Sequence, residues 1–561
     1  MAFSLVPRQF PDTYSRLKTI FEAVDIKDAS RSAYIGGLPR NMWSACNVGP
    51  TNSLCRCAHL SRTPRPSAGR AMGGIIQHLP ICPSFDPAHD WGESGDPPGK
   101  SEFHLPRVSS ILNRTLIQFP TCQQWITLRN YSARTRSLST SMLYDMPDGF
   151  PCLSNPPHPD SFFPNLRAVA WYPNNHLAML PFFRLLCGPT LTSLSAEFGT
   201  DPTSLAMLAS LSTLCPNIVH ISISAETPAL HDDLSTALST SICRWNDLEQ
   251  VLCDGLTVSA MEHLGQVKNL TSLTACASER MSPSFSPHHV QKSSFSRLQY
   301  LHLYAGLLST GTSALRDLRL TLTDFMLDIF DAEEMFSTPS SLKELFMTLA
   351  EACSHDCLAG LYLCIVNPHF PSADSMMTIR GVRPLLNFTH LRLVILDGFS
   401  TFSFEDNDIV ELASAWPHIE ELALSNYVHH PIASLPTLRS LFHLARSCPK
   451  LRALSLVVNM TDLTPCATGR DLRSDVLHDL CLGNTPINSP ATIARILHGL
   501  YPALKLVDLS VWNKEPLNRL AWRNRYQLSW GLVNVELAKL RGGNTRQVGP
   551  KCFVDTISDI E

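Results

Sequence analysis

One pattern of leucines recurs along most of the chain and restricts the folds that it can adopt. The pattern is an aromatic residue or Cys, often Pro, any residue, and then Leu-x-x-Leu-x-Leu, where Ile or Val can replace Leu. Successive copies are mostly 22 to 33 residues apart, with one step of 60 residues between Leu298 and Leu358 that reads as a long insertion. Such a period is typical of an array of stacked structural units. The clearest copies begin at Phe163, Cys215, Phe388, Trp416, Cys448 and Tyr501.

The spacing within each copy predicts a short strand. Alternate residues of a strand point to the same side, so Leu-x-Leu buries both leucines while the x residues point away. Amphipathic helices are predicted between the strands: one follows Pro490, a second includes Asp408 and Glu411, and a third follows Ser434. A unit of strand and helix cannot bury its apolar side alone, so neighbouring units must stack. We therefore predict an α/β fold, a leucine-rich-repeat solenoid with a curved parallel sheet and outer helices; the alternative is an ordinary multi-domain α/β protein.

Domain organisation follows from where the pattern holds. The 561 residues exceed what one hydrophobic core serves. The array is assigned to residues 161–515, with 112–160 as its entry segment and 516–561 as a C-terminal cap and loose tail. Residues 45–111 are rich in Pro, Ser, Gly, Cys and Arg and are predicted to be irregular and disordered. Residues 1–44 contain one helix-like stretch and a linker.

Composition excludes several classes of function. Hydrophobic residues make up 44% and charged residues 17% of the chain, which suits a folded protein. A net charge of -4 without a block of Lys or Arg gives no electrostatic footprint for nucleic acid. No run of about 18 apolar residues and no signal-like N-terminus occurs, so we expect no membrane span and a cytoplasmic or nuclear location. The 18 cysteines then read as small buried thiols.

Motifs for catalysis, cofactors and metals are weak. The segment from Gly95 to Ser101 is one residue too short for a phosphate loop, and its two prolines lack the N–H groups that bind phosphate. The Cys353-Ser-His355-Asp-Cys357 and Cys55-Arg-Cys57 clusters have no partner cluster at the spacing of a zinc site, so free thiols are favoured. We therefore expect no enzyme activity, no cofactor and no metal.

A family resemblance covers roughly residues 112–512. The segments Arg383-Pro-Leu-Leu-Asn-Phe388, Ala415-Trp-Pro-His-Ile-Glu-Glu-Leu422 and Ser447-Cys-Pro-Lys-Leu451 resemble the fungal F-box/leucine-rich-repeat proteins common in mushroom-forming species. Phe163-Pro-Asn-Leu166 and Arg136-Ser-Leu138 add to it. The resemblance implies a substrate-recognition subunit of an SCF-type (Skp1-cullin-F-box) ubiquitin ligase, in which the F-box binds Skp1 and the repeats bind a protein destined for ubiquitination. The alternative is a repeat scaffold that has lost its F-box and only mediates protein-protein interaction.

The F-box part departs from the family pattern. Leu17, Ile20, Phe21 and Val24 have the spacing of one amphipathic helix, but the further helices of an F-box do not follow. We read this stretch as a degenerate or truncated F-box and predict weak or no binding of a Skp1-like adaptor. The residues that resemble an adaptor-binding helix are Phe10, Pro11, Leu17, Ile20, Phe21 and Val24.

The x positions of the repeats are the predicted binding site for a protein partner. They are expected on the concave surface of the array, and they combine charges with Tyr and Arg, the residue types common in interface hot spots. For a single residue, an ordinary solvated strand face is the better explanation of such a side chain, so the prediction concerns the face as a whole. Its members are Tyr300, His302, Tyr362, Arg392, Glu420, Glu421, Arg452, His478, Asp479, Lys505 and Asp508.

Overall fold

The fold was analysed in a computed structural model of the chain. The structure describes thirteen stretches, and every structural statement below concerns these residues. The stretches are 121–139, 162–172, 176–225, 232–277, 294–316, 318–330, 339–365, 376–397, 402–424, 435–463, 473–482, 485–509 and 521–542. The predictions for residues 1–111, including the six adaptor-binding residues and the Gly95 and Cys55 motifs, lie outside the described residues.

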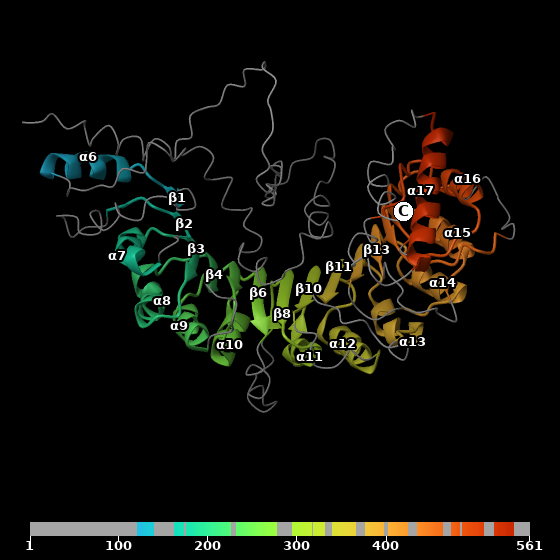
Figure 1. Cartoon of the computed structure of the whole chain (residues 1–561). Coiled ribbons are helices and arrows are strands. Elements are labelled where there is room, and N and C mark those ends of the chain that lie inside the picture. Colours follow the sequence, from blue (N-terminus) through green and yellow to red (C-terminus); the bar gives the residue numbers. More distant parts are fainter. Residues whose placement is uncertain are drawn as a thin grey trace, which may run out of the picture.

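The described residues form one curved leucine-rich-repeat solenoid around a sheet of 13 parallel strands. Figure 1 shows the strands lining the inside of the curve and the helices outside it. Neighbouring strands are in register: Leu301 of one repeat pairs with Phe325 of the next, and Phe325 pairs with Leu361 of the one after. The strands are β1 (Ser137–Ser139), β2 (Ala168–Trp171), β3 (Ser193–Phe198), β4 (His220–Ala225), β5 (Gln250–Cys253), β6 (Ser272–Ala277), β8 (Tyr300–Ala305), β10 (Asp324–Ile329), β11 (Gly360–Ile365), β12 (Leu393–Asp397), β13 (Glu421–Ala423), β14 (Ala453–Ser455) and β15 (Asp479–Cys481).

Helices between the strands form the outer layer. They pack against their sequence neighbours, as the strands do. The described helices are α6 (Cys122–Ser132), α7 (His176–Leu186), α8 (Pro202–Leu214), α9 (Asp232–Ile242), α10 (Val258–Gln266), α11 (Leu308–Leu315), α12 (Pro339–Ala352), α13 (Ile379–Val382), the 3-10 helix η3 (Arg383–Asn387), α14 (Asp406–Ala415), α15 (Leu438–Ser447), α16 (Pro490–Leu500) and α17 (Ala521–Leu540).

The aromatic residue or Cys that opens each sequence repeat is the residue that ends a helix. Trp416 leaves the helical region with φ -119° and ψ 63°, while its backbone N–H still donates to the Leu412 carbonyl. Its side chain is only 1% exposed, and the following Pro cannot continue the helix. Trp245 lies three residues beyond the end of α9, and its indole N–H donates to the Cys215 carbonyl of the preceding repeat at 2.8 Å. The motif thus ends one helix and links it to the previous unit.

The step of 60 residues between Leu298 and Leu358 is not an insertion. It contains a complete repeat, Leu322-x-x-Phe325-x-Leu327, whose strand β10 pairs with β8 on one side and β11 on the other. The prediction was wrong because Phe325 occupies a position where only aliphatic residues were sought. A small second sheet, β7 (Ser294–Phe295) with β9 (Arg319–Leu320), lies in the same region.

The three predicted helices are confirmed. The second is α14, which begins at Asp406 and includes Asp408 and Glu411, and the Asp408 carboxylate accepts the backbone N–H of Glu405 at 2.9 Å. The third begins at Leu438, and its N-cap is Thr437, whose hydroxyl accepts the Arg439 N–H; Ser434 lies outside the described residues. The helix after Pro490 is confirmed as α16.

A single hydrophobic core runs through the array, and this excludes separate globular domains within its described part. The recurring leucines of the pattern are buried between sheet and helices, and Leu422 and Leu454 are 1% and 2% exposed. At the C-terminal end, α17 packs against α16, and the buried Trp530 donates its indole N–H to the Thr485 carbonyl at 3.0 Å. None of the described helices is long and apolar enough to cross a membrane.

Candidate functional site

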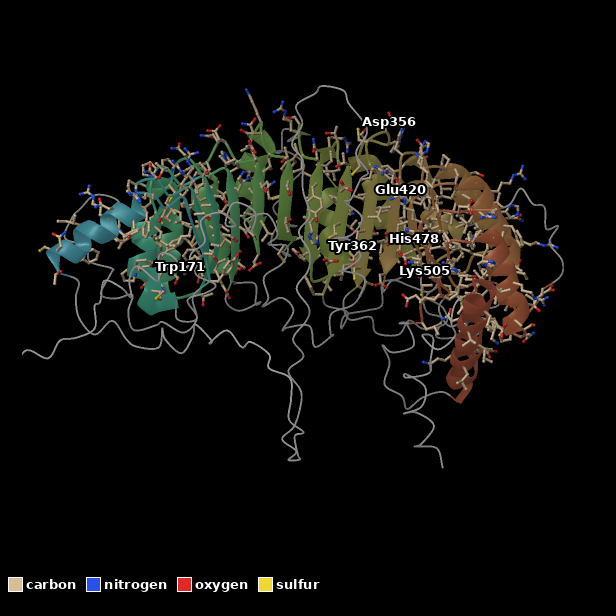
Figure 2. The ribbon with its side chains drawn as sticks, turned by 90° about the horizontal axis from the view of Figure 1, so that it is seen from above. Trp171, Asp356, Tyr362, Glu420, His478 and Lys505 are labelled. Atoms are coloured by element: carbon tan, nitrogen blue, oxygen red, sulfur yellow. The ribbon has the colours of Figure 1, made fainter. Side chains whose placement is uncertain are left out.

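The predicted site residues fall into two groups. Six lie on the concave face of the strands, in the rows that alternate with the buried leucines: Tyr300, His302, Tyr362, Glu421, Asp479 and, next to the Leu480–Val507 bridge, Asp508. The other five directly follow the first leucine of their repeats and lie where the strands begin, which we call the rim row. Figure 2, which looks onto the concave face, shows three rim residues and Tyr362. The rim row consists of Arg392, Glu420, Arg452, His478 and Lys505.

The centre of the concave face contains a buried ionisable pair. Nε2 of His302 on β8 lies 2.9 Å from Oδ2 of Asp328 on the adjacent strand β10. The two residues are 5% and 8% exposed. The register of the two strands brings the pair together. His302 is paired with Met326 and Tyr304 with Asp328, so His302 and Asp328 are diagonal neighbours on the same face of the sheet. A His–carboxylate pair in this setting fixes the imidazole, since the hydrogen bond selects which ring nitrogen carries a proton.

Aromatic rings surround this pair. The His302 ring lies 4.2 Å from the Tyr304 ring, measured between centroids, and meets Tyr300 edge-on at 6.3 Å. Tyr304 in turn stacks on Phe330, which follows β10, at 5.5 Å. The Tyr300 hydroxyl also donates to the Met326 sulfur at 3.8 Å. These rings and the thioether form the central cluster, which we define as Tyr300, His302, Tyr304, Met326, Asp328, Phe330 and Tyr362.

Two tyrosines of the central cluster are in a negative electrostatic environment. Burial raises the pKa of Tyr304 far above its ordinary value, and the nearby Asp328 and Asp254 carboxylates raise it further. Burial and the neighbouring Cys364, Asp328 and Asp397 act in the same direction on the pKa of Tyr362. Both phenols therefore stay neutral and keep an O–H that can donate a hydrogen bond.

The rim row forms a charged ladder along the second half of the array. Arg392 donates from Nε and Nη2 to Oε1 of Glu420 at 2.8 and 2.5 Å, and Nη1 of Arg452 lies 3.8 Å from Oε2 of the same carboxylate. His478 is 3.1 Å from Asp479. The Glu420 side chain is only 17% exposed, but Arg392, Arg452, His478 and Asp479 are 43–54% exposed, so these pairs add little stability and their outer partners are available to steer a bound protein.

Several members of the central cluster were missed by sequence reasoning. Tyr304 lies one residue beyond the Leu-x-Leu motif, because the strand continues past the last leucine. Met326, Asp328 and Phe330 belong to the repeat that was read as an insertion. Both omissions could have been avoided by extending each strand by two residues and by accepting Phe in place of Leu.

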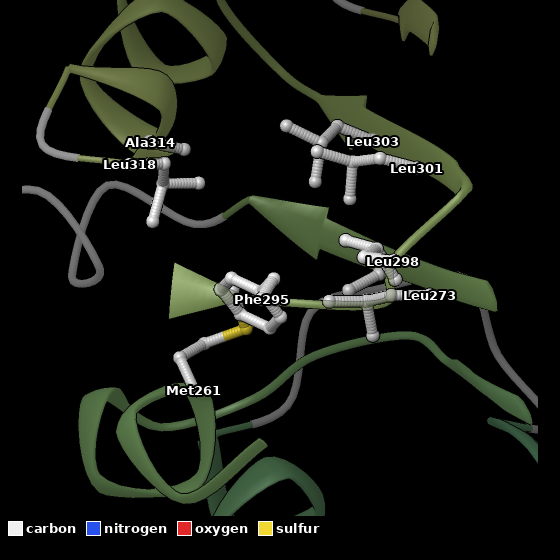
Figure 3. Close-up of a pocket in the computed structure, with 9 residues that line it drawn as sticks. Met261, Leu273, Phe295, Leu298, Leu301, Leu303, Ala314 and Leu318 are labelled. Atoms are coloured by element: carbon white, nitrogen blue, oxygen red, sulfur yellow. The ribbon is translucent and has the colours of Figure 1, made fainter. Parts of the chain in front are cut away.

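The remaining candidates are structural where they are described. Cys353 is buried, and Nε2 of His355 lies 2.9 Å from the Ala350 carbonyl while its ring packs edge-on against Phe388. Within the described stretches, no three His, Cys, Asp or Glu side chains are grouped to hold a metal ion. Behind β6 and β8 lies a small apolar cavity, in which Figure 3 shows Met261, Phe295 and Leu318 at the lining. It has no polar lining group to orient a ligand or a water molecule.

Comparison with known proteins gives structural matches only. No family model matches the chain, and no curated protein does. Among solved structures, the yeast Rad7–Elc1 complex matches with 14% identity and a TM-score of 0.31, covering 68% of this chain and 78% of that one. An internalin from Listeria monocytogenes matches with 14% identity and a TM-score of 0.30, covering 68% and 82%. The Arabidopsis receptor kinase HAESA, solved with the peptide hormone IDA and the co-receptor SERK1, matches with 13% identity and a TM-score of 0.15, covering 68% and 79%.

Proposed function

We propose that this chain is a protein-binding leucine-rich-repeat protein, not an enzyme, and that it recognises a protein with the concave face of its sheet. The observation that carries the proposal is the central cluster, in which three adjacent strands, β8, β10 and β11, bring aromatic rings around a His–Asp pair. Large aromatic side chains at the centre of a surface, surrounded by charged groups, are the arrangement found in interface hot spots.

The rim row adds a second component of recognition. Its charges lie at the start of the strands from β12 onward, and Arg392, Arg452 and His478 are exposed enough to attract and orient a partner before close contact forms. A hot spot supplies the affinity, and a charged border supplies specificity and association rate. The concave face of this array provides both within neighbouring repeats.

Site-specific photo-crosslinking tests the binding face. A photoreactive amino acid is placed in the full chain at Met326, which is half-buried in the central cluster, or at Met347, which is 46% exposed on the outer helix α12. The two positions come from the same repeat region and the same residue type. We expect protein adducts in cells from position 326 and few from position 347. Equal labelling, or labelling from 347 alone, would contradict the proposal.

We further propose that the chain acts as the substrate-recognition subunit of an SCF-type ubiquitin ligase, on the basis of its sequence resemblance to fungal F-box/leucine-rich-repeat proteins. The test is co-purification of Skp1 with the full chain, compared with residues 112–561. Loss of Skp1 in the shorter chain would support a ligase receptor. If neither chain retains Skp1, the alternative of a repeat scaffold without a ligase role is favoured.

A further inference from the structure

One row of side chains on the concave face has a carboxylate at four of its eight positions and no basic residue. It follows the last buried leucine position of the strands from β3 to β12, close to where the strands end. We call it the acidic row. Its charged members are all carboxylates, and none of the row's described positions is Lys or Arg. The row consists of Glu197, Ser224, Asp254, Cys276, Tyr304, Asp328, Cys364 and Asp397.

The register of the sheet sets the spacing of these carboxylates. Glu197 and Asp254 are two strands apart, Asp254 and Asp328 three, and Asp328 and Asp397 two. Because neighbouring strands are about 4.8 Å apart, the steps are roughly 10, 14 and 10 Å. The acidic row therefore crosses the sheet at right angles to the strands and passes through the central cluster.

Two carboxylates of the acidic row, Asp254 and Asp328, accept or share a hydrogen bond within the chain. Asp254 accepts the backbone N–H of Ala225 at 2.5 Å, and Asp328 pairs with His302. An ionised carboxylate has about four lone-pair sites, so one such bond does not saturate it. Burial raises the pKa of Asp254 despite its bond to the Ala225 N–H, which means that its charged form would gain from a nearby cation.

We propose that the occupant of the concave face is a basic, extended segment of the partner protein, lying along the acidic row with its cationic side chains at the carboxylates. This inference rests on the proposed protein-binding function and specifies the chemistry of the partner. A polyproline-II-like segment rises about 3.1 Å per residue and has three residues per turn, so side chains at i and i+3 point the same way about 9 Å apart. That distance matches the outer steps of the row. Arg suits the site because its guanidinium binds carboxylates in a bidentate fashion and stacks on Tyr rings.

A designed peptide tests the proposal with the full chain. The probe is a fluorescent Gly/Ser/Pro peptide with two Arg pairs, each spaced i, i+3 and separated by about four residues, as the spacing of the row requires. A control peptide of the same composition has its four Arg contiguous. We expect the spaced peptide to bind more tightly than the control, and its affinity to fall as salt is raised.

Matched variants locate the peptide. Asp254→Asn with Asp397→Asn should weaken binding about tenfold, as expected for the loss of two partly buried ion pairs. The control is Asp324→Asn with Glu344→Gln, which removes the same charge from another row of the face and from α12 and should leave the affinity unchanged. Equal loss in both variants, or no preference for the spaced peptide, would overturn the proposal.

Two further outcomes separate this proposal from its premise. If crosslinks form at Met326 but the basic peptide does not bind, the concave face binds protein and the partner chemistry is wrong. If neither is observed, the binding function fails as well. Should the full chain instead self-associate in a salt-sensitive way that the Asp254/Asp397 variant abolishes, the occupant is a second copy, and a separate basic partner is refuted.

Discussion

The side-chain amide of Asn534 on α17 takes the place of a neighbouring strand for Val507. Its Oδ1 accepts the Val507 N–H at 2.7 Å, and its Nδ2 donates to the Val507 carbonyl at 3.0 Å. On its other side, Val507 bridges to Leu480 of β15. The open edge of a sheet can pair with another chain and lead to aggregation. Here the Asn534 amide bonds both the N–H and the carbonyl of Val507, so α17 covers this edge.

We expect Asn534→Ala to lower the free energy of unfolding by about 2 kcal/mol, because two buried backbone groups lose their partner. The measurement is urea unfolding of the full chain followed by circular dichroism, with Asn246→Ala, at an exposed turn, as the control. The variant should also aggregate more readily. Equal stability of the two variants would show that the cap is dispensable.

The leucines of the repeats give a second prediction. Leu454 is 2% exposed, so Leu454→Asp would bury an unpaired carboxylate, which costs several kcal/mol. Leu506 belongs to the same repeat pattern but is 54% exposed, so Leu506→Asp should have little effect. Thermal unfolding compares the two. Similar melting curves for both variants would mean that the assignment of buried and open strand positions is wrong.

The His302–Asp328 pair should contribute to stability as a unit. Asp328→Ala leaves the buried imidazole without its partner, at a cost of about 1–3 kcal/mol, and His302→Ala does the same to the carboxylate. The double variant should lose less than the sum of the two single variants, because the second change removes the group that the first left unpaired. A double-mutant cycle by urea unfolding measures this. Additive losses would contradict the coupling.

Asp406 gives a prediction about pH. Burial raises the pKa of its carboxyl, but bonds from the hydroxyls of Ser440 and Thr437 and from the Thr437 N–H outweigh burial, and the pKa lies below its ordinary value. A lowered pKa stabilises the fold above the unfolded-state pKa, and this contribution is lost as the pH falls through the folded-state pKa.

Asp406→Asn should therefore lower stability at neutral pH by about 1 kcal/mol, the usual net worth of a weakened hydrogen bond. Its stability should also fall less steeply than that of the unaltered chain as the solution becomes acidic. The control is Asp475→Asn, whose side chain is 66% exposed. Parallel pH profiles for the unaltered chain and the Asp406 variant would refute the role of this carboxylate.

The fold was predictable because each repeat encodes it twice. The Leu-x-Leu alternation specifies a strand with one buried side, and the aromatic or Cys residue before Pro marks where the preceding helix ends. The central cluster was only partly predictable. Tyr300, His302 and Tyr362 were identified from the sequence. The pairing of His302 with Asp328 was not, because it depends on which strand lies next to β8. Since β10 was read as part of an insertion, the strand containing Tyr362 was expected there instead.

The acidic row was not predictable from the repeat motif for a related reason. Its members lie one position beyond the final leucine of each motif, where the residue type differs from repeat to repeat. The sequence of one repeat therefore gives no indication that this position belongs to a charged row. Only the common register of the parallel sheet aligns Asp254, Asp328 and Asp397 into one line. Structural alignment of the strands, not sequence alone, reveals charge that is spread over eight repeats.

Oxidative footprinting of methionines tests the central claim most directly. Met326 lies in the central cluster on the concave face, and Met347 lies on the outer helix α12. The full chain is exposed to hydroxyl radicals with and without the protein captured at position 326, and oxidation is measured by mass spectrometry. We predict that the partner protects Met326 and leaves Met347 unchanged. Protection of Met347 with continued oxidation of Met326 would place the binding site on the convex side and contradict the account.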